Sequence, residues 1–224
     1  MNTGITLNLF ADAALGKAQE PLCPGAMLLR GFALDNADAL IAAIQAMTNA
    51  APYRHLLTPG GLRMSVAMSN CGAVGWVSDR RGYRYDPVDP QSGMPWPAMP
   101  GLFLQLAQSA AATAGFEGFE PDACLINRYE PGARLSMHQD RDERDLRQPI
   151  VSVSLGIPAV FQFGGLQRVD ASRRSPLRVP LQHGDVVVWG GPARLNFHGI
   201  LPLKPAHHDV LGAQRINLTF RRAV

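Results

Sequence analysis

Residues 215–221 read Arg-Ile-Asn-Leu-Thr-Phe-Arg, with a polar residue at every odd position and an apolar residue at every even position. This period of two predicts a β-strand, because successive side chains of an extended chain point to opposite faces. One interpretation is an ordinary half-buried strand whose polar face contacts water. The other is a barrel whose interior receives Arg215, Asn217 and Arg221. Buried guanidinium groups need carboxylate partners, so the barrel interpretation predicts a bound dicarboxylate.

A His-x-Asp triplet, formed by His138, Gln139 and Asp140, precedes this strand. Side chains at i and i+2 of an extended segment share a face, so both can point at one metal ion. A second imidazole would complete a 2-His-1-carboxylate set, which leaves positions on Fe(II) for an oxidisable co-substrate and O2. The triplet alone is more typical of a solvated turn. Together with the arginines it indicates a non-haem iron oxygenase that uses 2-oxoglutarate.

The second imidazole is expected to be His198. Apolar residues flank it in Asn196-Phe197-His198-Gly199-Ile200, and it precedes the arginine strand. The histidines at positions 55, 183, 207 and 208 are alternatives that fall in turns, loops or on the surface. A further alternating segment ends at Tyr129 and places Asn127 on the same face, where both could bind the organic acid. The alternative for Tyr129 is an amphipathic ring in the core.

The remaining pattern predicts an α+β fold. We expect a helix after Asp35 or Asn36, with apolar residues at positions 40, 41, 44 and 47 on one face, and a second helix between Pro100 and Gly115. Residues 51–100 are rich in Gly and Pro and predict hairpins and loops. From residue 121 onward, short runs at 150–155, 159–163, 185–189 and 215–221 alternate with glycine turns, which is typical of a sandwich or jelly roll.

Composition is consistent with one soluble enzyme. The 224 residues are 46% hydrophobic and carry a net charge of +3, enough chain for one large core. Three distant cysteines predict reduced thiols in a cytoplasmic protein, and neither a signal peptide nor a membrane span is expected. Arginines cluster around and after the His-x-Asp triplet, which favours a polyanionic substrate such as nucleic acid. Compositional bias toward arginine is the alternative, since the chain has only two lysines.

Several longer blocks resemble the AlkB family of alkylated-DNA repair dioxygenases, within the Fe(II)/2-oxoglutarate oxygenase superfamily. The similarity extends from Leu9-Phe10-Ala11-Asp12 to Phe220-Arg221. Its most specific blocks are Ser65-Val66-Ala67-Met68, Pro95-Trp96-Pro97-Ala98-Met99-Pro100, Cys124-Leu125-Ile126-Asn127-Arg128-Tyr129, Phe161-Gln162-Phe163-Gly164-Gly165-Leu166 and Asp185-Val186-Val187-Val188-Trp189-Gly190-Gly191.

The resemblance implies a double-stranded β-helix, or jelly-roll, core over residues 121–224. N-terminal helices and a nucleotide-recognition lid within residues 1–120 would pack on this core in one structural domain. It implies that Fe(II) is bound by His138, Asp140 and His198. It also implies that 2-oxoglutarate contacts Asn127, Tyr129, Arg215, Asn217 and Arg221.

For the substrate, the resemblance implies a nucleotide pocket lined by Thr58, Met64, Met68, Trp76 and Tyr83. Trp76 would stack on the damaged base, with His138 on its other side. Without the resemblance, the methionines and Trp76 are better explained as packing under a long loop. Phosphate contacts would come from Arg134, Arg141 and Arg168, and Asp142 would favour cationic lesions. Gln167, Arg173-Arg174 and His207-His208 depart from the family pattern.

The implied activity is oxidative demethylation of 1-methyladenine and 3-methylcytosine by a monomeric enzyme that uses Fe(II), 2-oxoglutarate and O2. Its substrate would be single-stranded DNA, with RNA as an alternative. A base that must leave the stack for reaction is recognised well by aromatic and thioether surfaces. Two rival classes stay open: an oxygenase of this scaffold acting on a small molecule or a protein, and a non-catalytic nucleic-acid-binding module.

Overall fold

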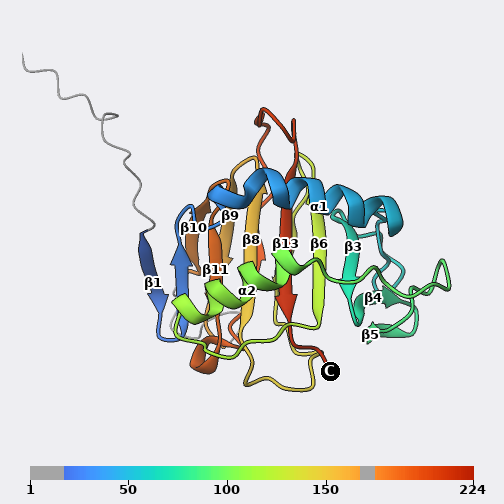
Figure 1. The fold of residues 1–224 in the computed structure, drawn as a ribbon, viewed down its shortest axis with the longest axis horizontal. Coiled ribbons are helices and arrows are strands. Elements are labelled where there is room, and N and C mark those ends of the chain that lie inside the picture. The colour runs from blue at the N-terminus through green and yellow to red at the C-terminus, as the bar shows by residue number, and fades with distance from the viewer. Residues whose placement is uncertain (1–17, 167–174) are drawn as a thin grey trace, which may run out of the picture.

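The computed structural model describes residues 18–166 and 175–224, and within these ranges two antiparallel sheets form the body of the protein (Figure 1). The larger sheet has seven strands, in the order β1 (Gln19–Cys23), β2 (Ala26–Leu29), β11 (Val186–Trp189), β8 (Ile150–Gly156), β13 (Arg215–Arg221), β6 (Ala123–Tyr129) and β3 (Ala67–Gly72). The smaller sheet has four strands, in the order β10 (Leu177–Leu181), β9 (Ala159–Phe163), β12 (His198–Ile200) and β7 (Leu135–His138). This arrangement confirms the jelly-roll prediction.

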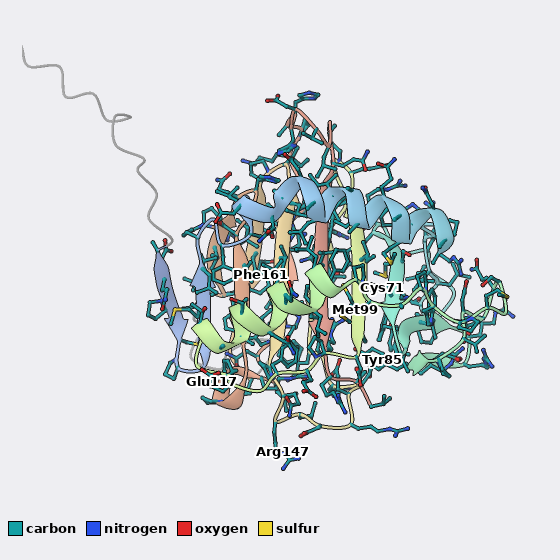
Figure 2. The ribbon with its side chains drawn as sticks, viewed as in Figure 1. Cys71, Tyr85, Met99, Glu117, Arg147 and Phe161 are labelled. Atoms are coloured by element: carbon teal, nitrogen blue, oxygen red, sulfur yellow. The ribbon has the colours of Figure 1, made fainter. Side chains whose placement is uncertain are left out.

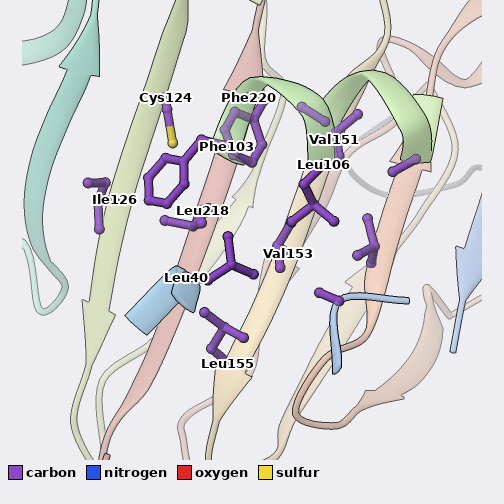
Figure 3. Close-up of a cluster of buried hydrophobic side chains, with 14 of the residues drawn as sticks. Leu40, Phe103, Leu106, Cys124, Ile126, Val151, Val153, Leu155, Leu218 and Phe220 are labelled. Atoms are coloured by element: carbon purple, nitrogen blue, oxygen red, sulfur yellow. The ribbon is translucent and has the colours of Figure 1, made fainter. Parts of the chain in front are cut away.

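Two helices cross one face of the larger sheet, α1 (Ala37–Ala50) and α2 (Gly101–Thr113) (Figure 1). Their apolar residues, which include Leu40 and Phe103, pack against Leu218 and Phe220 of β13 (Figure 3). Apolar residues recur at helical spacing along each helix and so form one apolar face. Burial of that face against the sheet stabilises both helices. Both predicted helices are confirmed.

Strand β13 is buried along its whole length, although four of its seven residues are polar. Its apolar residues face the helices, so the alternating polar residues face the smaller sheet. Arg215 is 1% exposed and Arg221 is 7% exposed. The interpretation in which this polar face contacts water is therefore wrong, and the barrel interpretation is confirmed.

The segment before residue 121 contributes more strands than its sequence pattern predicts. Strands β1, β2 and β3 join the larger sheet, and β4 (Gly75–Asp79) pairs with β5 (Gly82–Asp86) in a separate hairpin. The short runs that form β10 and β12 were also not predicted. In the described part of the chain, neither helix is long and apolar enough to cross a membrane.

The hairpin formed by β4 and β5, which we call the recognition hairpin after the nucleotide-recognition lid predicted for this part of the chain, lies beside the β3 edge of the larger sheet (Figure 1). Gly75 begins it where no side chain fits, because a Cβ atom there would lie 2.4 Å from Cε2 of Trp96. Asn70 of β3 then holds Trp76 at both backbone groups, accepting from its N–H and donating to its C=O at 3.0 Å each. The hairpin is thus fixed to the sheet at its first residues.

Candidate metal and keto-acid site

Three potential metal ligands converge between the two sheets. His138 ends β7 and His198 begins β12, and the two are direct partners in the register of that strand pair. Asp140 follows β7 by two residues, and one ligand atom of each of these three residues lies within 4.8 Å of the others. Nε2 of His138 is 3.4 Å from Oδ1 of Asp140, and Nε2 of His198 is 3.7 Å from the same oxygen. This donor set suits Fe(II).

Backbone carbonyls orient both imidazoles. Nδ1 of His138 lies 2.9 Å from the carbonyl oxygen of Ser136, and Nδ1 of His198 lies 3.0 Å from that of Asn196. A carbonyl oxygen can only accept, so each Nδ1 carries a proton, and each Nε2, which lies toward Asp140, is the nitrogen left to coordinate a metal ion. The rings are held in the tautomer that metal coordination requires.

Electrostatics keep the Asp140 carboxylate ionised. Burial alone raises the pKa of Asp140, but Arg221 and the two histidines outweigh it and hold that pKa well below its usual value. Burial and the neighbouring His138 lower the pKa of His198 to about 4, so that ring is neutral at physiological pH. For His138, burial lowers the pKa, but Asp140 outweighs it and the net shift is upward.

Arg215 is a buried cation with unused hydrogen-bonding capacity. Its Nη2 donates to Oγ of Ser154 at 2.9 Å, and its guanidinium lies 4.9 Å from the centre of the Tyr129 ring. Within the described structure, its Nε and Nη1 have no hydrogen-bond partner, and neither has Oδ1 of Asn127. Buried donors of this kind need an acceptor, and a ligand carboxylate fits the guanidinium fork. The Arg215 guanidinium therefore fits one carboxylate of 2-oxoglutarate.

Strand register brings these groups together. Arg215 lies opposite Tyr129 and Asn217 lies opposite Asn127 in the β13–β6 pair. The Asn217 amide is already bonded within the sheet, to Oγ of Ser152 at 2.8 Å and to the carbonyl of Val153 at 2.9 Å. Its role toward 2-oxoglutarate stays a prediction.

The predicted nucleotide pocket residues lie on the recognition hairpin and the segment before it. Trp76 stacks on Tyr83 with ring centroids 5.5 Å apart and an interplanar angle of 13°. Nε1 of Trp76 donates to Oδ2 of Asp142 at 2.9 Å, which places the indole beside the loop that carries Asp140. Met68 is buried in the core, with Met64 and Trp76 packed partly against the same cluster.

The other predicted substrate residues have mixed surroundings. Oγ1 of Thr58 accepts a hydrogen bond from the N–H of Leu62 and so closes a turn. The backbone of Arg134 is bonded at both its N–H and its C=O to Oγ of Ser65. Arg141 is exposed. Arg168, the Arg173-Arg174 pair, Gln167 and the block at residues 9–12 lie outside the described residues.

Sequence reasoning missed three residues that pack beside the triplet, namely Glu143, Arg194 and the half-buried Tyr85. Glu143 accepts from Nη2 of Arg194 at 2.9 Å and from the hydroxyl of Tyr85 at 2.6 Å. Glu143 is 7% exposed and Arg194 3% exposed. No local pattern separates Glu143 from the charged residues around it, so only its burial identifies it.

Comparisons with known proteins agree with this geometry. Residues 25–221 match the model of the 2OG-Fe(II) oxygenase superfamily. The chain is 58% identical over 217 residues to the alpha-ketoglutarate-dependent dioxygenase AlkB of Escherichia coli K12, covering 97% of this chain and 98% of that protein. It is 33% identical over 132 residues to the human nucleic acid dioxygenase ALKBH1, covering 58% of this chain and 32% of that protein. The solved structure of OsALKBH1 superposes with a TM-score of 0.79 at 29% identity, covering 92% of this chain and 100% of that chain.

This chain therefore belongs to the 2OG-Fe(II) oxygenase superfamily and to the AlkB family within it, and it is a dioxygenase that uses Fe(II), 2-oxoglutarate and O2.

Proposed function

We propose that this dioxygenase removes methyl groups oxidatively from 1-methyladenine and 3-methylcytosine in single-stranded DNA, with RNA as a second substrate class. The products are the unmodified base, formaldehyde, succinate and CO2. The carrying observation is that an aromatic pair, Trp76 and Tyr83, is bonded through Trp76 to Asp142, two residues from Asp140. The family membership and the relative named as a nucleic acid dioxygenase support the same substrate class.

In this proposal His138, Asp140 and His198 bind Fe(II). Arg215 and Tyr129 bind the distal carboxylate of 2-oxoglutarate, with Asn127 and Asn217 beside them and Arg221 nearer the iron. When bound, iron, 2-oxoglutarate and O2 would supply the oxidant: one oxygen atom of O2 would enter succinate as CO2 leaves, and the other would hydroxylate the N-methyl carbon, whose hydroxymethyl product would release formaldehyde. Burial of Arg215 keeps water from competing with a co-substrate carboxylate for its guanidinium group.

The substrate base is held by stacking and by charge. Methyl groups on N1 of adenine or N3 of cytosine block pairing and leave the ring cationic, so these bases cost little to unstack. Trp76 stacks on the ring, His138 lies on its other side, and the exposed carboxylate of Asp142 favours the positive charge. Thr58, Met64, Met68 and Tyr83 complete the pocket, and Arg134, Arg141 and Arg168 contact backbone phosphates.

The organisation follows from these roles. Residues 1–120 supply the helices and the recognition lid, which includes the recognition hairpin, and residues 121–224 supply the catalytic core. We further propose that the protein is a monomer of the cytoplasm that does not engage membranes.

One anaerobic experiment tests the function. Protein, Fe(II), 2-oxoglutarate and an oligonucleotide with a single 1-methyladenine are mixed, O2 is admitted, and succinate, formaldehyde and the oligonucleotide mass are followed. We expect one succinate and one formaldehyde for each methyl group lost, and no methyl loss in the Asp140→Ala variant.

The rival functions predict other results. An oxygenase of small molecules or proteins would form succinate without a change in oligonucleotide mass. A non-catalytic binding module would bind the strand without iron and tolerate Asp140→Ala. Either result would overturn the proposed substrate.

A further inference from the structure

Two side-chain hydrogen bonds join the recognition hairpin to the loop that follows Asp140. Nε1 of Trp76 donates to Oδ2 of Asp142 at 2.9 Å, and the hydroxyl of Tyr85 donates to Oε1 of Glu143 at 2.6 Å. Trp76 and Tyr85 are cross-strand partners in the hairpin, and Asp142 and Glu143 are consecutive. One cross-strand pair of the hairpin, Trp76 and Tyr85, therefore bonds two consecutive residues of the loop that follows the predicted metal ligand Asp140.

The two bonds end in different surroundings. Asp142 is exposed to solvent, whereas Glu143 is buried between two guanidinium groups. Oε2 of Glu143 accepts from Nη2 of Arg194 at 2.9 Å, and its Oε1 lies 3.3 Å from Nε of Arg221. Arg194 also donates to the backbone carbonyl of Asp140 at 2.6 Å. A buried carboxylate held in this way has little freedom, so a change at Tyr85 reaches its partners.

The contacts continue without interruption to the ligand carboxylate. Arg221, which faces Glu143, donates from Nε and Nη2 to Oδ2 of Asp140 at 2.8 and 2.6 Å. Oδ1 of Asp140 faces both imidazoles. Burial raises the pKa of Tyr85 well above its usual value, so its hydroxyl keeps the proton that it donates to Glu143. Figure 2 shows Tyr85 at the hairpin side of the larger sheet.

We propose that Tyr85 and Glu143 are positioning residues that couple the recognition hairpin to the orientation of Arg221 and Asp140. The proposal rests on the proposed function, because it takes Asp140 as a metal ligand and the hairpin as the base-binding element. Metal and keto acid fix Asp140 and Arg221, and through Glu143 they restrict the hairpin. By linkage, a base that holds the hairpin in place also favours the loaded site.

Hydrogen exchange of the recognition hairpin tests this coupling without nucleic acid. Amide exchange in residues 75–86 is measured by mass spectrometry with and without Co(II) and 2-oxoglutarate, since Co(II) replaces iron without turnover. In the wild type, loading the site slows exchange of the hairpin. In Tyr85→Phe we expect this loading effect to shrink about fivefold, the lower end of typical coupling between two sites.

The matched control is Tyr53→Phe. Tyr53 is also a half-buried tyrosine, but its buried hydroxyl has no hydrogen-bond partner within the described structure. Removal of the Tyr53 hydroxyl should leave the effect of metal and keto acid on hairpin exchange as large as in the wild type. Glu143→Gln keeps the shape of the side chain but weakens the acceptor, and it should reduce the loading effect as Tyr85→Phe does.

Three results would overturn the coupling: no loading effect in the wild type, a full loading effect in Tyr85→Phe, or an equal loss in Tyr53→Phe. Should Glu143→Gln not fold, the two tyrosine variants still decide the question. Because the exchange experiment contains no oligonucleotide, a negative result in it does not affect the conclusion of the demethylation assay. Absence of formaldehyde in that assay likewise leaves the exchange result standing.

Discussion

Arg221 donates two hydrogen bonds to Oδ2 of Asp140, at 2.8 and 2.6 Å, while Oδ1 of the same carboxylate lies 3.4 Å from Nε2 of His138. One oxygen of Asp140 is therefore bound to a cation within the protein, and the other is directed toward the imidazoles. The guanidinium sets the plane of the carboxylate, which determines where a metal ion can sit.

Replacing Arg221 by lysine should weaken metal binding. Lysine keeps the charge but cannot form the paired bonds to one carboxylate oxygen and the contact to Glu143. We expect the dissociation constant of Co(II), measured by calorimetry, to rise about tenfold, as for other residues that orient metal ligands. Arg147→Lys is the control, because the Arg147 side chain is 90% exposed. An unchanged Co(II) affinity in Arg221→Lys would show that Asp140 needs no such support.

Replacing Arg215 by lysine should act on the keto acid instead. The buried guanidinium fork would be lost, and each hydrogen bond to a charged group contributes about 1.5–3 kcal/mol. The KM for 2-oxoglutarate should rise about tenfold or more in succinate-release assays, with Co(II) affinity in the absence of 2-oxoglutarate unchanged. Arg178→Lys, on the exposed side of β10, serves as the comparison. A loss confined to metal affinity would contradict the assignment of Arg215.

Trp76 should contribute mainly to binding of the base. Stacking of a base on an aromatic ring contributes about 1–3 kcal/mol, so Trp76→Leu should raise the KM for a methylated oligonucleotide by roughly 5- to 150-fold. Trp76→Phe keeps an aromatic face but loses the hydrogen bond to Asp142. Its KM for the oligonucleotide should therefore lie between those of the wild type and Trp76→Leu. Steady-state kinetics with the oligonucleotide as the varied substrate gives both values. Equal kinetics for Trp76→Leu and wild type would exclude stacking on this residue.

The protein should become less stable as the pH decreases, because of His183, which lies away from the metal site. Nδ1 of His183 accepts from the N–H of Gly156 at 2.9 Å, and burial and the neighbouring His208 lower the pKa of His183. The unfolded chain, with the ordinary histidine pKa of about 6.5, therefore takes up a proton first. The contribution is present above about pH 6.5 and is lost as the pH falls below it.

Urea unfolding at pH 7.5 and 5.5 measures this effect. The free energy of unfolding should decrease less over this interval in His183→Asn than in the wild type. His207→Asn is the control, because His207 is exposed. If His183→Asn loses as much stability as the wild type, the histidine does not titrate in this way.

The sequence alone determined the features that repeat within one segment. The period of two along β13 fixed both its extended conformation and the common face of Arg215, Asn217 and Arg221. The helical period fixed α1 and α2. The His-x-Asp spacing predicted two convergent ligands, and they do converge, although Asp140 lies two residues beyond the end of β7. These features depend on the local geometry of the chain, which a single segment contains in full.

Tertiary structure alone decided which side of β13 is covered and which charges are buried. No residue within β13 reveals that the smaller sheet lies over its polar face, because that depends on strands distant in the chain. The same holds for Glu143, which is one of several charged residues in a row and differs from them in its burial against Tyr85 and Arg194. Burial and pairing are set by contacts between segments far apart in sequence, and the alternation of residues in one strand carries no information about them.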